Sequence, residues 1–275
     1  MRRSFRKYGW RFLRATALLV LMMPLVTPLP AAQPPSRPVG EILKSFVEDF
    51  RNDPAAGSRY VIGITVRGSN EPEWHVVVGG RKDAAGRFDI ELRKGMPAEP
   101  APIYVTDRET LEKIDRGEIN ALTAMGKARS SDAAPMDVSF TAGFEPTEEF
   151  LTGFIPFTFH FWTRGFPETV RFDQAAGREV HGATMVVLYY QKGLRSAWGH
   201  IRKGQRVNAD PKDQVNPFPT MLIGLRGRAM AKVGGVEKIL GAGQMVFVPS
   251  GTAHEAWNPF DEPAEFIILM FGEGA

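Results

Sequence analysis

The chain contains no cysteine among its 275 residues. Disulfides, thiolate metal sites and cysteine nucleophiles are therefore excluded. Several catalytic motifs are missing as well: there is no G-x-S-x-G nucleophile elbow, no phosphate-binding loop, no dinucleotide fingerprint and no His-Glu-x-x-His pair. These absences remove the common hydrolase, nucleotide-binding and zinc-protease arrangements.

The net positive charge disappears once the first 32 residues are set aside. The chain has a formal net charge of +3, and residues 1–32 hold six Lys and Arg with no acids, which leaves −3 for residues 33–275. The charge therefore gives no support for nucleic-acid binding. The hydrophobic fraction of 43% is ordinary for a globular protein, so the chain can bury a core.

Residues 1–32 have the layout of an export signal. The basic segment MRRSFRKYGWRFLR precedes the apolar ATALLVLMMPLV, and the Pro- and Ala-rich TPLPAAQPPSRP follows. The apolar run is about half of the roughly 20 residues that a membrane-spanning helix needs. The opening MRRSF partly resembles a twin-arginine export motif. We expect a signal peptide cleaved at Ala31 or Ala32 and a periplasmic protein; an uncleaved membrane anchor is the alternative.

A linker is predicted at residues 33–41, and an α+β domain at residues 42–142. EILKSFVEDFRND has the apolar spacing of an amphipathic helix. Strands follow in RYVIGITVRG, EWHVVVGG, GRFDIELRKG and PIYV, bounded by turn residues. Thr106 or Asp107 can cap a second helix, and NALTAMG predicts a short third one.

Two phrases in this domain, IYVTDRETLEKIDRGEIN and ALTAMGKARSSDAAPMDV, resemble the SCP2 (sterol-carrier-protein-2-like) family. The resemblance implies a five-stranded sheet and an apolar tunnel for lipids, and it brings no catalytic residues. The alternative is an α+β module with a solid core.

An aromatic-rich connector is predicted at residues 143–178. Eight Phe and Trp residues lie between Phe144 and Phe166. Such a density is typical of a surface that packs two domains together, or of a lid over an apolar pocket or a membrane-touching surface. We expect His160, which lies among these aromatics, to be structural rather than a metal ligand.

Residues 179–275 are nearly all β. Six or more short alternating or apolar segments between Gly and Pro turns predict a sandwich or jelly-roll barrel. Within them, GQMVFVPSGTAHEAWN resembles the second signature motif of the cupin family, type 2. The positions that carry the resemblance are Gly243, Pro249, Gly251, His254 and Asn258. The resemblance implies a jelly-roll barrel in which a tight bend at Pro249 and Gly251 directs His254 into the mouth of the barrel.

The first cupin motif, which would supply two His and a Glu, is degraded. Counting back from the central hairpin places its ligands at Gln214, Asn216 and Thr220, and counting forward places two of them at Asp210 and Lys212. Neither set offers a His or the expected Glu, and amides and hydroxyls are poor ligands for transition metals. We therefore predict no metal or other cofactor.

An atypical metal site is the alternative. It would bind one divalent transition metal through His254 and His200 with one Asp of the loop. Otherwise these side chains would line a ligand pocket. The residues predicted for that pocket are His254, His200, Trp198, Gln214, Asn216 and Trp257.

The sequence favours an exported, non-enzymatic carrier or sensor for a lipid or other hydrophobic small molecule. The cupin would be a second pocket or a homodimerisation module. The enzyme alternative is a cupin dioxygenase or isomerase with the atypical metal site. A third hypothesis is a structural partner of an exported enzyme. We expect no nucleic-acid partner.

Overall fold

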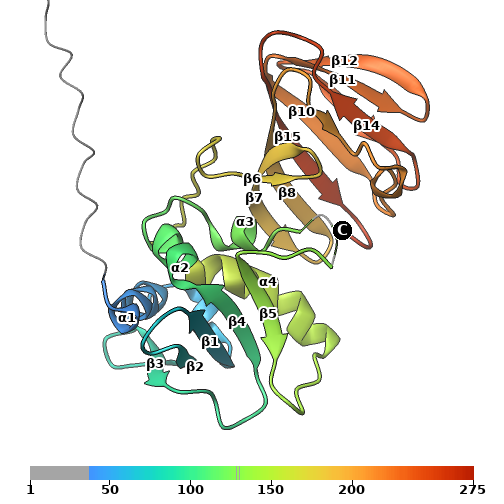
Figure 1. Ribbon diagram of the computed structural model, residues 1–275. Coiled ribbons are helices and arrows are strands. Elements are labelled where there is room, and N and C mark those ends of the chain that lie inside the picture. The colour runs from blue at the N-terminus through green and yellow to red at the C-terminus, as the bar shows by residue number, and fades with distance from the viewer. Residues whose placement is uncertain (1–36, 128, 130) are drawn as a thin grey trace, which may run out of the picture. The chain divides into compact units, whose positions relative to one another are not determined.

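The computed structural model describes residues 37–127, 129 and 131–275 (Figure 1). The predicted signal peptide, residues 1–32, lies outside the described residues, as do residues 33–36 of the linker. Residues 37–275 form one compact unit. In this part of the chain, no helix is long and apolar enough to cross a membrane.

Helix α1 (Val39–Phe50) begins inside the range predicted as linker. It starts directly after Pro38, where the fixed φ of proline is compatible with a helix start. Its apolar residues recur at helical spacing and are all buried: Val39, Ile42, Leu43, Phe46, Val47 and Phe50. Residues 39–41 are therefore the first turn of a core helix rather than linker.

A five-stranded sheet follows, in the order β3-β2-β1-β4-β5. Its strands are β1 (Tyr60–Arg67), β2 (Glu73–Lys82), β3 (Phe88–Lys94), β4 (Pro102–Asp107) and β5 (Met136–Phe140). Only the β1–β4 pair is parallel among its pairings. The predicted strands are present, so the alternating apolar pattern located them correctly.

Three short helical elements connect this sheet. They are the 3₁₀ turn η1 (Pro54–Gly57) and the helices α2 (Arg108–Asp115) and α3 (Ala121–Met125). The Asp107 carboxylate caps α2 by accepting from Thr110 N at 2.8 Å, and Asn120 caps α3 in the same way. Of the two caps predicted for α2, Asp107 is the one used.

Helix α4 (Glu148–Trp162) holds most of the aromatic stretch. Its buried residues Phe157, Phe161 and Trp162 belong to the same core as Phe46 and Phe50 of α1. The stretch predicted as a connector therefore contains a core helix of the α+β domain. Its other face does meet the barrel, because the Phe159 ring lies 5.2 Å from Tyr189.

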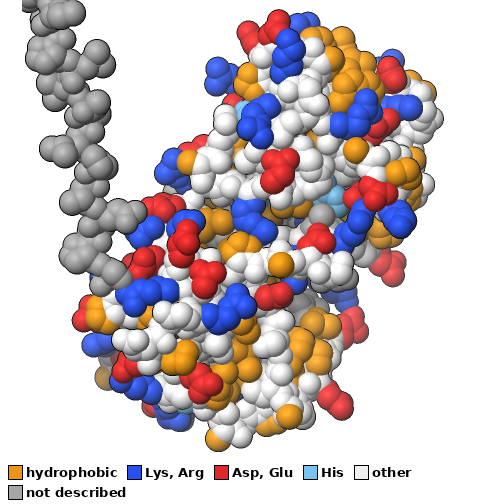
Figure 2. All heavy atoms as spheres, viewed as in Figure 1, with side chains coloured by type: hydrophobic (Ala, Val, Ile, Leu, Met, Phe, Trp, Pro, Cys, Tyr) orange, Lys and Arg blue, Asp and Glu red, His pale blue; other side chains and the backbone are white. Residues whose placement is uncertain are grey.

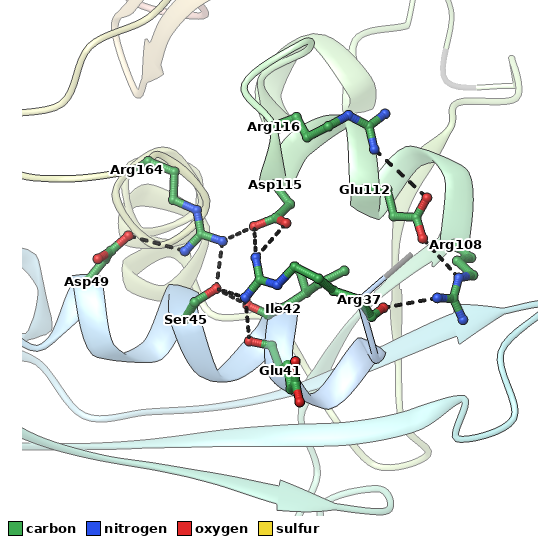
Figure 3. A network of polar contacts seen from close by, with 10 residues as sticks. All are labelled: Arg37, Glu41, Ile42, Ser45, Asp49, Arg108, Glu112, Asp115, Arg116 and Arg164. Atoms are coloured by element: carbon green, nitrogen blue, oxygen red, sulfur yellow. Dashed lines mark hydrogen bonds and ion pairs between the residues drawn. The ribbon is translucent and has the colours of Figure 1, made fainter. Parts of the chain in front are cut away.

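A polar network joins three helices of this domain (Figure 3). Asp115 at the end of α2 forms ion pairs with Arg37, at 2.8 Å, and with Arg164. Arg164 also donates to Ser45 Oγ at 2.8 Å and lies over the Phe46 ring. The Asp115 carboxylate thus connects α2 to Arg37, which precedes α1, and to Arg164, which follows α4.

The remaining strands form two sheets, and all of the pairings found in them among the described residues are antiparallel. The first has the order β13-β10-β15-β8-β7-β6 and the second β12-β11-β14-β9. Their bounds are β6 (Arg178–Val180), β7 (Ala183–Gln191), β8 (Leu194–Ile201), β9 (Arg206–Val207), β10 (Thr220–Arg226), β11 (Arg228–Val233), β12 (Val236–Gly241), β13 (Met245–Val248), β14 (His254–Trp257) and β15 (Ala264–Phe271), with a 3₁₀ turn η2 (Pro211–Asp213). Apolar side chains between the sheets make a separate core.

Candidate functional site

A cavity of about 530 Å³ lies in the barrel. Its apolar lining comes from both sheets and includes Met185, Ala197, Ile201, Leu222, Ala229, Ala231, Leu240, Phe266, Ile268 and Met270. Leu122 and Met125 of α3 and Ile155 of α4 also contribute to its wall. This volume is within the range of small-molecule sites.

The predicted bend delivers His254 to this cavity. Gly251 has φ +72°, a conformation that favours glycine, and it follows Pro249 after β13. The bend is held against a facing loop, because Gly251 N donates to Asn216 O and His254 N donates to Gln214 O, both at 2.8 Å. The local sequence therefore fixes where the imidazole enters.

His254 is a neutral, buried imidazole. It is 7% exposed, and burial lowers its pKa below the ordinary value. Its Nδ1 lies 3.2 Å from Thr252 O, which can only accept, so Nδ1 carries the hydrogen. The other ring nitrogen, Nε2, is then an acceptor.

Three of the positions counted as degraded metal ligands line the same cavity: Asn216, Thr220 and Lys212. Asn216 Nδ2 donates to Thr220 Oγ1 at 3.4 Å, and both residues line the cavity with His254. Gln214 does not line it: its side chain donates to Asn208 O at 3.0 Å. An imidazole, an amide and a hydroxyl thus line the cavity together.

The prediction that Trp198 and His200 line this pocket is wrong. The β8 residues that line the cavity are Arg195, Ser196, Ala197 and Ile201, and Trp198 and His200 are not among them. Because side chains alternate along a strand, Trp198 and His200 face away from Ala197 and Ile201. Trp198 packs on the outer face of its sheet against Ala176, and its ring stacks 5.9 Å from His200. The alternative metal pair of His254 and His200 is therefore split between the two faces of the barrel wall.

His200 is nonetheless an unusual group. It is 1% exposed, and neither ring nitrogen has a hydrogen-bond partner among the described residues. Burial lowers its pKa, so the imidazole is neutral. It faces Glu265 and Thr184 across the strands.

Trp257 also points away from the cavity. It stands three residues after His254 in β14, an odd spacing that puts the two side chains on opposite faces. The Arg206 guanidinium lies 4.5 Å from its ring. The spacing alone could have given this result.

Asn258, the last motif residue, is structural. It is fully buried, and its amide donates to Ile201 O at 3.0 Å and Glu262 O at 2.8 Å. Its Oδ1 accepts from Phe260 N at 2.8 Å. Two of these bonds lie within the turn between β14 and β15, and the third ties that turn to the end of β8.

Charged and polar side chains complete the lining. Arg195 and His181 both line the cavity. Arg195 Nε and His181 Nδ1 are buried and have no hydrogen-bond partner among the described residues. Lys127, Lys212 and Asp213 also contribute. Nothing in the local sequence marks the α3 and α4 residues of the wall, since they precede the barrel by tens of residues.

The family comparison matches the "Cupin domain" model to residues 206–270. Residues 206–270 form a cupin domain. A comparison with curated proteins finds no significant match.

Solved structures with a similar arrangement are distant. A cupin 2 conserved barrel domain protein from Salinispora arenicola is 20% identical, over 38% of this chain and 88% of its own, with a TM-score of 0.34. An RmlC-like cupin from Shewanella frigidimarina is 22% identical, over 33% and 77%, with a TM-score of 0.30. A predicted oxalate decarboxylase from Thermotoga maritima is 19% identical, over 32% and 79%, with a TM-score of 0.30.

Proposed function

We propose that this protein binds an apolar small molecule with an acidic group in its cupin cavity and does not act on it chemically. The observation that carries this proposal is the roughly 530 Å³ cavity, walled mainly by apolar side chains. Burial of apolar ligand surface contributes about 25 cal/mol per Å². An apolar ligand therefore suits this wall better than a sugar or a nucleotide.

The acidic group is inferred from Arg195. Within the part of the chain that the structure describes, its Nε is buried without a hydrogen-bond partner, and a buried unsatisfied donor costs about 1–3 kcal/mol. Its guanidinium lies 4.5 Å from the Tyr190 ring and 5.2 Å from the Phe218 ring, which hold it in place. A carboxylate in the cavity would satisfy that donor through a charge-assisted hydrogen bond.

The barrel residues do not fit a transition metal. Cavity donors near the motif are one imidazole, one amide and one hydroxyl, from His254, Asn216 and Thr220. Neutral oxygen donors of this kind bind transition metals weakly. His181, Asp213 and Glu255 also line the cavity, but among the described residues they do not form a group of three ligands with His254. We therefore assign no metal-dependent step to the cavity.

The α+β domain enters the proposal through its SCP2 resemblance, which favours a lipid or similar ligand. Its own interior is filled by α1 and α4 aromatics such as Phe46, Phe157 and Trp162. We therefore place the ligand in the barrel. Together with the leader, this gives an exported, periplasmic carrier or sensor.

A homodimer through the cupin domain is part of the proposal. Large apolar side chains are exposed on neighbouring strands of the barrel: Leu225, Val236, Ile239, Met245 and Phe247. Figure 2 shows hydrophobic side chains gathered at the end of the molecule where Figure 1 labels β12. Pairing of two such faces would cover them.

The test measures binding of cis-parinaric acid, a fluorescent apolar carboxylate. Native protein should bind it before and after chelator treatment. Arg195→Met should weaken binding about tenfold or more, and Arg226→Met, at an exposed arginine of β10, should not. No binding by native protein would refute the carrier function. Equal binding by Arg195→Met would refute the acid contact.

The enzyme alternative makes a different prediction. A cupin dioxygenase or isomerase would hold one metal ion in the barrel, and His254→Ala would remove both the ion and the activity. Under our proposal, His254→Ala leaves the metal content of the protein unchanged. Metal analysis of the two proteins decides between them.

A further inference from the structure

Three metal-ligating side chains converge in the α+β domain, away from the cupin motif. They are Asp53, just before η1, His160 of α4, and Glu168, which follows α4. One ligand atom from each lies within 4.8 Å of the other two. Asp53 and Glu168 are 3% and 9% exposed at their side chains, and His160 is 25% exposed.

The contacts among these groups are hard to satisfy with hydrogen alone. His160 Nδ1 lies 3.1 Å from Asp53 Oδ2 and also contacts Glu168 Oε1. A ring nitrogen carries at most one hydrogen, so it cannot donate fully to both carboxylates. A cation bound to Nδ1 and to both oxygens would instead satisfy all three groups at once.

The charge of the three side chains also favours a bound cation. Two carboxylates carry −2, and a protonated His160, whose pKa is raised by its hydrogen bond to Asp53, would cancel only one of these charges. The remaining charge would be uncompensated at a buried site, which is costly. The ion pairs of Asp53 and Glu168 found among the described residues are those with His160. A divalent ion would bring the group to neutrality.

We propose that Asp53, His160 and Glu168 hold one divalent transition-metal ion. One imidazole nitrogen and two carboxylate oxygens suit Zn²⁺, Mn²⁺ or Fe²⁺. The partial exposure of His160 leaves room for water to complete the coordination. This site is independent of the cupin cavity and of the proposed carrier function, and it replaces the structural role expected for His160.

The ion would act as a clamp. It joins residues 107 positions apart in the sequence and fixes Glu168 to the α+β core. The chain that follows Glu168 supplies Val170 and Ala176, which pack against Trp198 on the barrel. The clamp would therefore anchor the segment that covers the outer face of the barrel sheet.

The test uses the full chain, stripped with a chelator and titrated with Zn²⁺ and, separately, with Mn²⁺ by calorimetry. We expect uptake of one ion per chain and a rise in the thermal unfolding midpoint. Asp53→Asn and Glu168→Gln keep the side-chain size and should each weaken binding at least tenfold. Glu149→Gln, at an exposed residue of α4 outside the cluster, is the matched control and should bind like the native protein.

Cobalt gives a second readout. Co²⁺ bound by the native protein should show visible absorption bands that Glu168→Gln loses. Circular dichroism and a cooperative thermal transition verify that each variant is folded, so a loss of metal in a folded variant supports the site. No uptake by the native protein, or equal uptake by both carboxylate variants, would overturn it and leave a protonated His160 between two carboxylates. Loss of metal in His254→Ala alone would assign the ion to the barrel instead.

Discussion

Replacing Phe161 with alanine should destabilise the α+β domain by about 3–5 kcal/mol. Phe161 is 2% exposed, and its ring lies 5.5 Å from Phe50 and 4.9 Å from Trp162. The substitution removes a buried ring and leaves a cavity that rigid neighbours on two helices cannot fill. The large value therefore follows from α4 being a core helix rather than a lid.

The free energy of unfolding would be measured by urea denaturation, with hydrogen exchange of β1 and β10 peptides to separate the two domains. The β1 peptides should lose protection first. Leu151→Ala changes an exposed residue of the same helix, 55% exposed, and should cost about 0.5 kcal/mol or less. A loss below about 1 kcal/mol for Phe161→Ala, with altered cis-parinaric acid binding, would refute the core assignment and favour a lid.

Three further predictions concern stability. Asn258→Ala removes three hydrogen bonds at a fully buried turn and should cost the barrel about 2–4 kcal/mol in urea denaturation; a cost below about 1 would contradict its structural role. Asp115→Asn removes a carboxylate that is 10% exposed and pairs with two arginines, so it should cost about 1–3 kcal/mol, whereas Asp49→Asn, 43% exposed, should cost under about 1. Burial lowers the pKa of His254 below 6.5, so below that pH the unfolded chain binds a proton that the folded chain does not. The thermal midpoint should therefore fall as pH drops from 6.5 to 5, and less so in His254→Gln; parallel curves for the two proteins would rule out a buried neutral His254.

The sequence located the elements well because their signals are local. Apolar spacing marked α1, alternation marked β1 to β4, and a capping carboxylate marked α2. The bend before His254 was likewise predictable, since Pro249 and Gly251 fix it within a few residues. The high density of aromatic residues around Phe157 was evident from the sequence. Whether these residues pack inside one domain or between two domains was not, because both environments favour the same aromatic side chains.

What the sequence determined by itself is the set of residues that share a face. Trp198 and His200 do lie together, as their spacing of two requires. Only the tertiary structure decided which face is the interior, because residues near Ala176 cover the outer face and bury both sides of β8. The same holds for Asp53 and His160: residues 107 positions apart meet only once α4 has packed on α1, and no local pattern records that contact.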